Sequence, residues 1–153
     1  MELGKFEILE ELGRGGFGIV YKAHDKTLNR LVAIKELYPE LLTDPSFLSR
    51  FKQEAQIAAN LDNPNVVPVY EFGESKGRYY IVMGYMPGGS LKDLIKKEGS
   101  LSKERALEIL QQFGAGLTYI HKKGVIHRDL KPGNILFDDT GKARISDMGF
   151  AKL

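Results

Sequence analysis

The sequence predicts an α+β fold with antiparallel strands in its first half and mainly helices in its second. Apolar side chains recur at every second position from residue 17 to residue 23, a period that is typical of a strand. Residues 47–61 and 106–120 instead carry apolar side chains at helical spacing. We therefore expect a strand-rich part that contains one helix, followed by a mainly helical part.

The composition is that of a globular domain. Of the 153 residues, 42% are hydrophobic and 27% are charged, and the net charge is only +2. This near balance does not favour nucleic acid or an anionic membrane as a partner. The chain has no cysteine, no apolar run long enough to span a membrane and no signal peptide at its charged start. We therefore expect a cytoplasmic protein without disulfides or thiolate metal sites.

Capping and turn residues define the elements of the first half. Asp44 and Pro45 suit the N-cap and the first position of a helix that ends before Asn63. Two further strands are expected at residues 66–73 and 78–83, because each run is rich in β-branched and aromatic residues.

The second half is expected to begin with a linker at residues 84–89 and a short helix at residues 90–97. Ser102 suits the N-cap of a longer helix, and Gly124 suits the position just after its end. The apolar face expected for this helix comprises Ala106, Leu110, Phe113, Leu117 and Ile120. The remaining elements are a strand at residues 125–126 and a hairpin of residues 135–137 and 143–146.

A lysine ends the apolar run Val32–Lys35, where it would ordinarily reach for solvent. A half-buried ammonium needs an anionic partner, because the desolvation of an unpaired charge is costly. Glu54 lies beside the apolar stripe of the following helix, whereas the neighbouring Gln53 and Gln56 carry no charge. We therefore prefer a Lys35–Glu54 ion pair to the alternative that Glu54 is an ordinary surface residue.

Residues 127–134 place a carboxylate, an amine and a carboxamide on one short loop, at Asp129, Lys131 and Asn134. Phosphoryl transfer from a nucleotide needs a carboxylate to orient the attacking hydroxyl and an amide oxygen to bind Mg²⁺. His127 is expected to be a core residue and not a base.

The glycine-rich stretch Leu12–Val20 has three interpretations. A dinucleotide-binding fingerprint uses the same glycine spacing but opens a helix, whereas here a strand period follows. Glycines between two strands can instead form a hairpin whose backbone lies close over phosphates, because no Cβ intervenes. The third interpretation is a flexible turn without a ligand.

Four motifs occur in the order that is typical of eukaryotic-like (Hanks-type) serine/threonine protein kinases, of the bacterial type. Residues 12–20, 32–35, 127–134 and 147–150 resemble their glycine-rich loop, lysine strand, catalytic loop and magnesium-binding triplet. Met148 stands where the triplet usually has phenylalanine. The resemblance spans the whole chain, and it implies an enzyme that transfers a phosphoryl group from Mg²⁺-ATP to a protein hydroxyl.

The resemblance also implies a kinase-like division of the chain. Residues 1–83 would form a complete N-lobe with a five-stranded antiparallel sheet and one helix, and residues 84–89 the hinge. Residues 90–153 would form the first part of the C-lobe, without the activation segment and the peptide-binding helices. We expect the apolar face of the helix after Ser102 to be partly bare for that reason.

By resemblance, Asp129 would position the hydroxyl, Lys131 would contact the γ-phosphate, and Lys35 with Glu54 would orient the other phosphates. Asn134 and Asp147 would bind Mg²⁺. Met83 would be the gatekeeper, and the carbonyl of Gly84 and the amide of Met86 would bond the adenine. The full set expected to contact ATP is Leu12, Gly13, Gly15, Gly18, Val20, Ala33, Lys35, Met83, Gly84, Met86 and Leu136.

Two other functions stay open at this point. The chain could be a non-catalytic ATP-binding or interaction module, because the part that would bind a protein substrate is missing from these residues. A small-molecule kinase of the same fold is a further alternative, although Arg128 and Lys131 look like those of the protein kinases.

Overall fold

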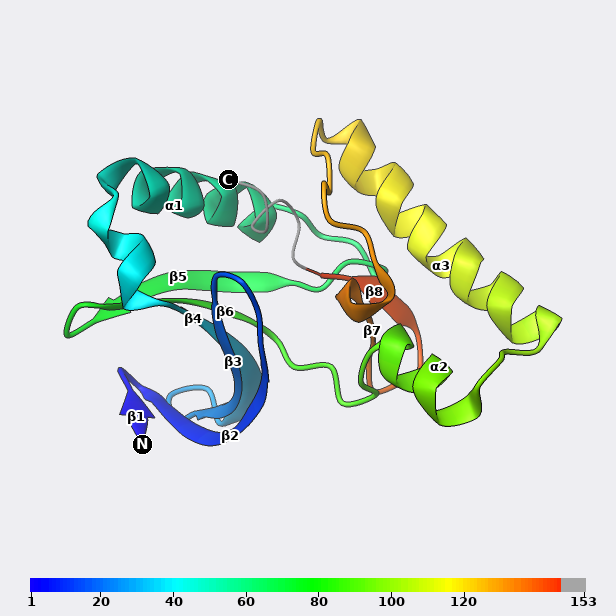
Figure 1. The fold of residues 1–153 in the computed structure, drawn as a ribbon, viewed down its shortest axis with the longest axis horizontal. Coiled ribbons are helices and arrows are strands. Elements are labelled where there is room, and N and C mark those ends of the chain that lie inside the picture. Colours follow the sequence, from blue (N-terminus) through cyan, green and yellow to red (C-terminus); the bar gives the residue numbers. More distant parts are fainter. Residues whose placement is uncertain (147–153) are drawn as a thin grey trace. The chain divides into compact units, whose positions relative to one another are not determined.

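The structure is a computed structural model that describes residues 1–146, and these residues form two compact units (Figure 1). The first unit comprises Met1–Asn60 and Pro68–Tyr85. Of the described residues, the second comprises Leu61–Val67 and residues 86–146. The short segment Leu61–Val67 thus belongs with residues from which the stretch Pro68–Tyr85 separates it in the sequence.

The first unit is built on an antiparallel sheet with the strand order β1-β2-β3-β4-β6-β5, which curls in Figure 1. Its strands are β1 (Glu2–Leu3), β2 (Phe6–Arg14), β3 (Gly18–Asp25), β4 (Arg30–Leu37), β5 (Val69–Ser75) and β6 (Arg78–Gly84). The five expected strands are present, and the two-residue β1 adds a sixth by pairing with the start of β2. The strand expected from residue 66 begins only at Val69.

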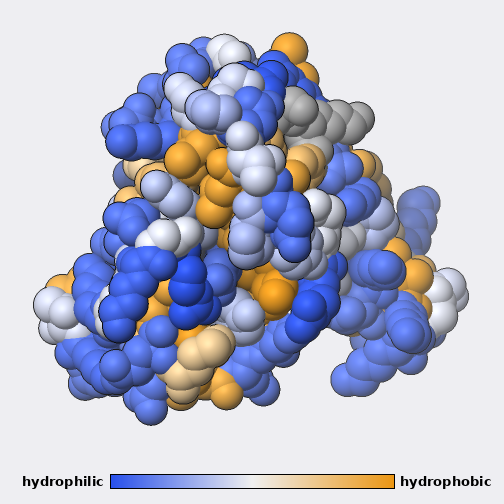
Figure 2. All heavy atoms as spheres, turned by 60° about the vertical axis from the view of Figure 1, so that its left-hand side comes forward, coloured by the Kyte–Doolittle hydropathy of each residue, from blue (hydrophilic) through white to orange (hydrophobic). Residues whose placement is uncertain are grey.

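The two faces of this sheet differ, because successive side chains of a strand point to opposite sides. Val32 and Ile34 of β4 have no exposed surface and pack into a core with Phe6 and Val82. Lys35 alternates with them and is also buried, with 6% of its surface exposed. Figure 2 shows mostly hydrophilic residues over the molecular face that it presents, with apolar residues in smaller patches between them.

The single α-helix of the first unit, α1 (Pro45–Ala59), begins where capping chemistry predicts. The side chain of Asp44 accepts a hydrogen bond from the backbone N–H of Ser46, and Pro45 occupies the first turn. A short 3₁₀ helix, η1 (Pro39–Thr43), precedes it. The predicted apolar face is confirmed, since Phe47, Phe51, Ala55 and Ala58 are buried. The helix packs along β5 (Figure 1).

The second unit contains two α-helices and a short hairpin. Its elements are α2 (Leu91–Glu98), α3 (Lys103–Lys122), the 3₁₀ turn η2 (Pro132–Asn134), β7 (Ile135–Phe137) and β8 (Ala143–Ile145). Ser90 and Asp93 form a reciprocal capping box at the start of α2. The side chain of Ser102 accepts from the backbone N–H of Arg105 at the start of α3, as expected.

Helix α3 ends in a Schellman motif at Gly124, whose φ of +78° is a conformation that glycine adopts without strain. Its N–H donates to the carbonyl of His121 (3.0 Å), and the N–H of Val125 donates to the carbonyl of Ile120 (2.9 Å). The prediction of a strand at residues 125–126 is wrong. This segment is irregular, and Ile126 is 66% exposed.

The buried face of α3 differs from the expected one. Ile109 and Ile120 are buried, at 2% and 0% exposure, whereas Leu110 is 52% exposed. The core of this unit is formed by Leu91, Ile109, Ile135, Phe137 and Ala143. The expected apolar face is thus partly bare, as predicted. The buried side of the helix is rotated toward Ile109, because the hairpin β7–β8 packs there. Among the described residues, no helix is both long enough and apolar enough to cross a membrane.

Candidate active site

The glycine-rich loop connects β2 to β3, and one hydrogen bond closes it between the N–H of Gly15 and the carbonyl of Gly18 (2.9 Å). Gly18 has a structural reason to lack a side chain, because a Cβ there would lie 1.9 Å from the carbonyl oxygen of Glu36. A Cβ at Gly13 or Gly15 would meet no described atom within 4 Å. Packing within the unit thus explains Gly18 but not the other two glycines.

The element after the glycines decides between the interpretations of this motif. Gly18 begins the strand β3, which pairs antiparallel with β2 and β4, so the glycines lie between two strands. A dinucleotide-binding fingerprint requires a helix at this point. That alternative is excluded by the fold.

The sheet brings several predicted ATP-contacting residues of the first unit onto one face. Val20 of β3 and Ile81 of β6 lie directly opposite Lys35 of β4. Two residues away on β4, Ala33 lies opposite Met83 of β6. Residues that face each other in register, and residues two apart on a strand, share one side of a sheet. Val20, Ala33, Lys35 and Met83 therefore form one surface.

Helix α1 covers part of this same side, since the rings of Phe51 and Phe72 are in contact and Phe72 of β5 lies opposite Ile81. Glu54 is half-buried on α1, whereas Gln53 and Gln56 are exposed. The orientation expected for Glu54 is thus observed. Its ion pair with Lys35 stays a prediction.

The expected hinge begins at the end of β6. The N–H of Gly84 donates to the carbonyl of Pro68 (2.9 Å), and Gly84 lies opposite Val32 in the sheet. Met86 is the first residue of the second unit in this part of the chain, and its carbonyl accepts from the N–H of Gly89 (3.4 Å). The adenine contacts proposed for Gly84 and Met86 stay predictions.

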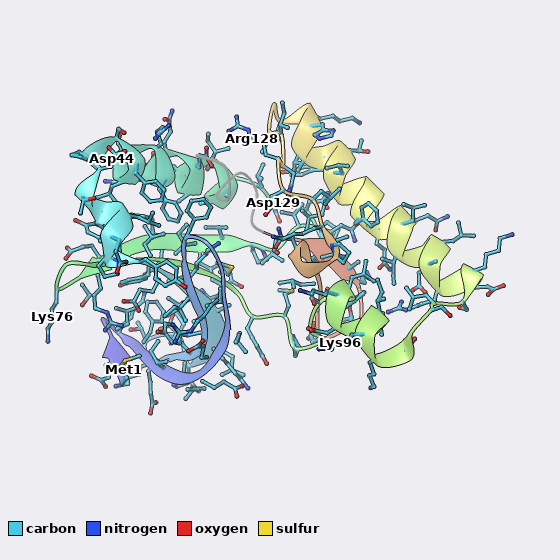
Figure 3. All side chains as sticks on the ribbon, viewed as in Figure 1. Met1, Asp44, Lys76, Lys96, Arg128 and Asp129 are labelled. Carbon is cyan, nitrogen blue, oxygen red and sulfur yellow. The ribbon has the colours of Figure 1, made fainter. Side chains whose placement is uncertain are left out.

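Asp129, Lys131 and Asn134 lie together on the loop that follows α3. The side-chain nitrogen of Asn134 donates to the backbone carbonyl of Asp129 (2.8 Å) and to its Oδ2 (3.2 Å). The Nζ of Lys131 lies 3.3 Å from the same Oδ2. The Lys131 side chain is 59% exposed and that of Asp129 is 24% exposed, so the carboxylate is oriented but accessible. Figure 3 labels Arg128 and Asp129 on this loop.

The imidazole of His127 makes hydrogen bonds through both ring nitrogens, and these bonds define its tautomer. The backbone N–H of Asp129 donates to its Nδ1 (3.2 Å), which must therefore be unprotonated. The proton on Nε2 points to the carbonyl of Ser146 (2.6 Å). His127 is 2% exposed, as expected for a core residue.

Ser146 is a supporting residue that the sequence did not indicate. Its N–H and its hydroxyl both donate to the carbonyl of Asn134, at 2.9 and 3.2 Å. Together with His127 it ties the end of the β7–β8 hairpin to the loop of residues 127–134. A serine next to an aspartate is common in loops, so no local sequence pattern could have identified the supporting role of Ser146.

Backbone pairing joins the strand β7, which contains Leu136, to the segment that follows Met86. The N–H of Phe137 donates to the carbonyl of Gly89, and the N–H of Gly88 donates to the carbonyl of Phe137, both at 2.9 Å. Leu136 is half-buried and bridges to Ser90. Asp147 lies outside the described residues.

The chemistry of Asn134 fits a magnesium ligand. Because its Nδ2 is engaged by Asp129, its Oδ1 is the side-chain atom able to bind a cation, and Mg²⁺ prefers oxygen. Within residues 1–146, no group of three or more His, Asp or Glu side chains is arranged to hold a metal ion. Mg²⁺ at Asn134 would thus depend on further oxygen ligands, as is usual where phosphates complete the coordination.

Comparison with known proteins defines the family. The family model described as "Protein kinase domain" matches residues 6–153. The chain is 43% identical over 148 residues to the serine/threonine-protein kinase PrkC of Bacillus subtilis, covering 97% of this chain and 23% of PrkC. It is 45% identical over 148 residues to a probable serine/threonine-protein kinase of Clostridium perfringens, covering 97% of this chain and 22% of that protein.

A third relative is the serine/threonine-protein kinase PknA of Mycobacterium tuberculosis, which is 41% identical over 154 residues. The alignment covers 97% of this chain and 36% of PknA. The chain belongs to the protein kinase family and is similar to serine/threonine kinases of bacterial type. It spans between about a fifth and a third of the length of these relatives.

Proposed function

We propose that this chain is the ATP-handling part of a serine/threonine protein kinase, which transfers the γ-phosphoryl group of Mg²⁺-ATP to a hydroxyl of a protein substrate. The observation that carries the proposal is the arrangement of Asp129, Lys131 and Asn134. One amide and one ammonium lie within 3.3 Å of a single accessible carboxylate oxygen. A constellation of this kind suits transfer chemistry that depends on positioning and charge.

Asp129 would orient the substrate hydroxyl and accept its proton. The hydrogen bonds from Asn134 fix the backbone and the carboxylate together, which limits the rotamers open to Asp129. Proton acceptance by a positioned carboxylate contributes about 10²- to 10⁴-fold to a rate. Most of the remaining acceleration would come from positioning and from neutralisation of the phosphate charge.

Lys131 would supply mobile positive charge to the γ-phosphate. Its long side chain is mostly exposed and contacts Asp129 at 3.3 Å, so the ammonium can move to a phosphate oxygen at small cost. Asn134, together with Asp147, would hold Mg²⁺ through side-chain oxygens. Bound Mg²⁺ would neutralise negative charge on the phosphates.

The first unit would bind the nucleotide itself. Val20, Ala33 and Met83 offer an apolar surface suited to a purine, and the buried ammonium of Lys35 lies on the same side of the sheet. Glycines at positions 13 and 15 leave the loop backbone open to phosphates. Leu136 would be the apolar contribution of the second unit. We assign the reaction to the cytoplasm, where ATP is abundant and where a chain without cysteine needs no disulfide.

The proposal is tested by measuring ATP binding and phosphoryl transfer separately. Thermal unfolding of residues 1–153 should shift upward with Mg²⁺-ATP, and ligand at a hundred times its Kd adds about 2.7 kcal/mol of stability. Lys35→Met should abolish the shift, whereas Asp129→Asn should retain it. In the longer kinase that contains this chain, Asp129→Asn should abolish phosphorylation of a protein substrate.

Undiminished transfer by the Asp129→Asn kinase would contradict the assigned mechanism. ATP binding by the longer protein without any transfer would instead support the alternative of a non-catalytic ATP-binding or interaction module. Addition of EDTA tests whether transfer requires a metal ion, since EDTA should abolish phosphoryl transfer by the wild-type kinase.

A further inference from the structure

A row of aromatic rings connects the tip of the glycine-rich loop to helix α1 and to the sheet. Phe17, between Gly16 and Gly18, stacks on Phe47 with ring centroids 6.0 Å apart and an interplanar angle of 19°. Phe47 stacks on Phe51 at 5.9 Å, and Phe51 contacts Phe72 of β5 at 6.1 Å. Phe47 lies in the first turn of α1, three residues after Asp44, which Figure 3 labels at the start of the helix.

The backbone fixes the direction of the Phe17 side chain. The carbonyl of Phe17 accepts a hydrogen bond from the N–H of Tyr38 (3.0 Å), just beyond the end of β4. The next residue, Gly18, lies so close to the carbonyl of Glu36 that no Cβ fits between them. Glu36 is in turn held by Arg78 of β6 through two hydrogen bonds of 2.7 Å. The base of the loop is therefore rigid where Phe17 leaves it.

The glycines before Phe17 are held less firmly. Gly13 pairs with Val20, and the N–H of Gly15 donates to the carbonyl of Gly18. No described atom lies within 4 Å of where a Cβ of Gly13, Gly15 or Gly16 would be, so side-chain packing does not restrain this segment. Ordering a loop on a ligand costs conformational entropy, and a contact that holds the loop beforehand lowers that cost. Phe47 provides such a contact, since it is 7% exposed and packed within the helix–sheet interface.

We propose that Phe17 and Phe47 are positioning residues that hold the glycine-rich loop against the first turn of α1. This stacking couples the binding of the ATP phosphates to the position of the helix that carries Glu54. The inference rests on the proposed function, because it assumes that phosphates bind beneath the loop. The spacing of the glycines alone does not indicate this role for Phe17.

The helix can transmit this coupling along one face. Phe47, Phe51 and Glu54 follow at spacings of four and three residues, so they lie on the same side of α1. Phe51 is fully buried and contacts Phe72, so the middle of the helix is anchored to the sheet. A displacement of the loop that breaks the Phe17–Phe47 stack thus alters the support of the turn that precedes this anchor.

The inference is tested by comparing two ligands, Mg²⁺-ATP and adenosine, by isothermal titration calorimetry on residues 1–153. Phe17→Leu and Phe47→Leu each remove the ring stacking and keep an apolar side chain of similar size. Each should weaken Mg²⁺-ATP binding by about 2- to 10-fold, the range expected for loss of one aromatic pair. The double variant should bind no more weakly than Phe47→Leu alone, because Phe17→Leu removes only the Phe17–Phe47 contact, which Phe47→Leu removes together with the Phe47–Phe51 stack. Adenosine, which has no phosphates, should bind all variants as it binds the wild type.

Phe6→Leu is the matched control. Phe6 is a buried phenylalanine of the same unit whose ring contacts Tyr80 edge-on at 6.0 Å, within the core cluster that includes Val32 and Ile34. It should lower stability without changing the ratio of the two affinities. Thermal unfolding of each variant without ligand establishes that it is folded before the titration.

The possible outcomes separate this inference from the proposed function. Equal weakening of ATP and adenosine, additive effects in the double variant, or unchanged ATP binding would overturn the positioning role while ATP binding stands. Failure of the folded wild-type protein to bind either ligand would overturn the proposed function, and this inference with it.

Discussion

The side-chain nitrogen of Asn134 lies 2.8 Å from the backbone oxygen of Asp129 and 3.2 Å from its Oδ2. One buried amide thus fixes both the backbone and the carboxylate of the residue proposed to accept the substrate proton. The same arrangement leaves the amide oxygen of Asn134 for a cation. Orientation of the proposed proton acceptor and the proposed binding of the metal would therefore be linked in a single side chain.

Replacement of Asn134 by alanine should lower stability as well as remove the proposed metal ligand. Asn134 is 5% exposed, and the loss of two hydrogen bonds at a buried position costs about 1–3 kcal/mol. Urea unfolding measures this change. The matched control is Asn60→Ala, whose exposed amide donates one bond to the carbonyl of Gln56 and should cost about 0.5 kcal/mol or less. Equal losses in the two variants would contradict the structural role of Asn134.

The glycines of the loop should divide into two classes. Gly18→Ala places a Cβ 1.9 Å from a backbone oxygen and should destabilise the protein by about 1–3 kcal/mol or more. Gly15→Ala meets no described atom and should leave stability unchanged, yet it should weaken Mg²⁺-ATP binding if the loop lies over phosphates. Thermal unfolding and titration of both variants measure the two effects. A Gly15→Ala protein with unchanged ATP affinity would favour a turn without a ligand.

Asp138 makes the second unit sensitive to acid. Burial acts to raise the pKa of its carboxyl, but hydrogen bonds from Thr140, from the N–H of Lys142 and from Arg144 outweigh burial and lower the pKa to about 2 from 3.8. A lowered folded-state pKa stabilises the protein above the unfolded value and loses that effect as the pH falls through the folded value.

We therefore expect Asp138 to contribute up to about 2 kcal/mol at pH 5, and to lose this contribution between about pH 4 and pH 2. Asp138→Asn should be less stable at pH 5 and should show a smaller loss of stability in acid. Urea unfolding at pH values from 5 to 2 tests this, with the exposed neighbour in Asp139→Asn as control. Parallel pH profiles for Asp138→Asn and the wild type would contradict the assignment.

Truncation to alanine should affect stability to very different extents at two neighbouring residues of α3. Ile109→Ala removes a side chain that is 2% exposed and should cost about 2–5 kcal/mol. Leu110→Ala removes one that is 52% exposed and should change stability by about 0.5 kcal/mol or less. Urea unfolding measures both. A large loss for Leu110→Ala would mean that this side chain is covered in solution.

Much of the fold could be predicted from the sequence because its signals are local. The cap at Asp44, the glycine at 124 that ends α3, and the strands β3, β5 and β6 follow from residue type and spacing within a few positions, whereas the count of five strands was implied by the family resemblance. Where the predictions were wrong, a distant contact decided. The face of α3 is rotated because β7 and β8 pack against Ile109, and no spacing within the helix encodes that partner.

The sequence by itself determined the family and the order of the motifs, since each motif is a short run of residues with a defined chemical purpose. Only the tertiary structure decided which glycine of the glycine-rich loop is required by packing, which ring nitrogen of His127 carries the proton, and that Ser146 supports Asn134. It also joined Phe17 to Phe47, which lie thirty positions apart in the chain. These relationships depend on distances between residues that are remote in sequence, and such distances are fixed only when the strands and helices pack.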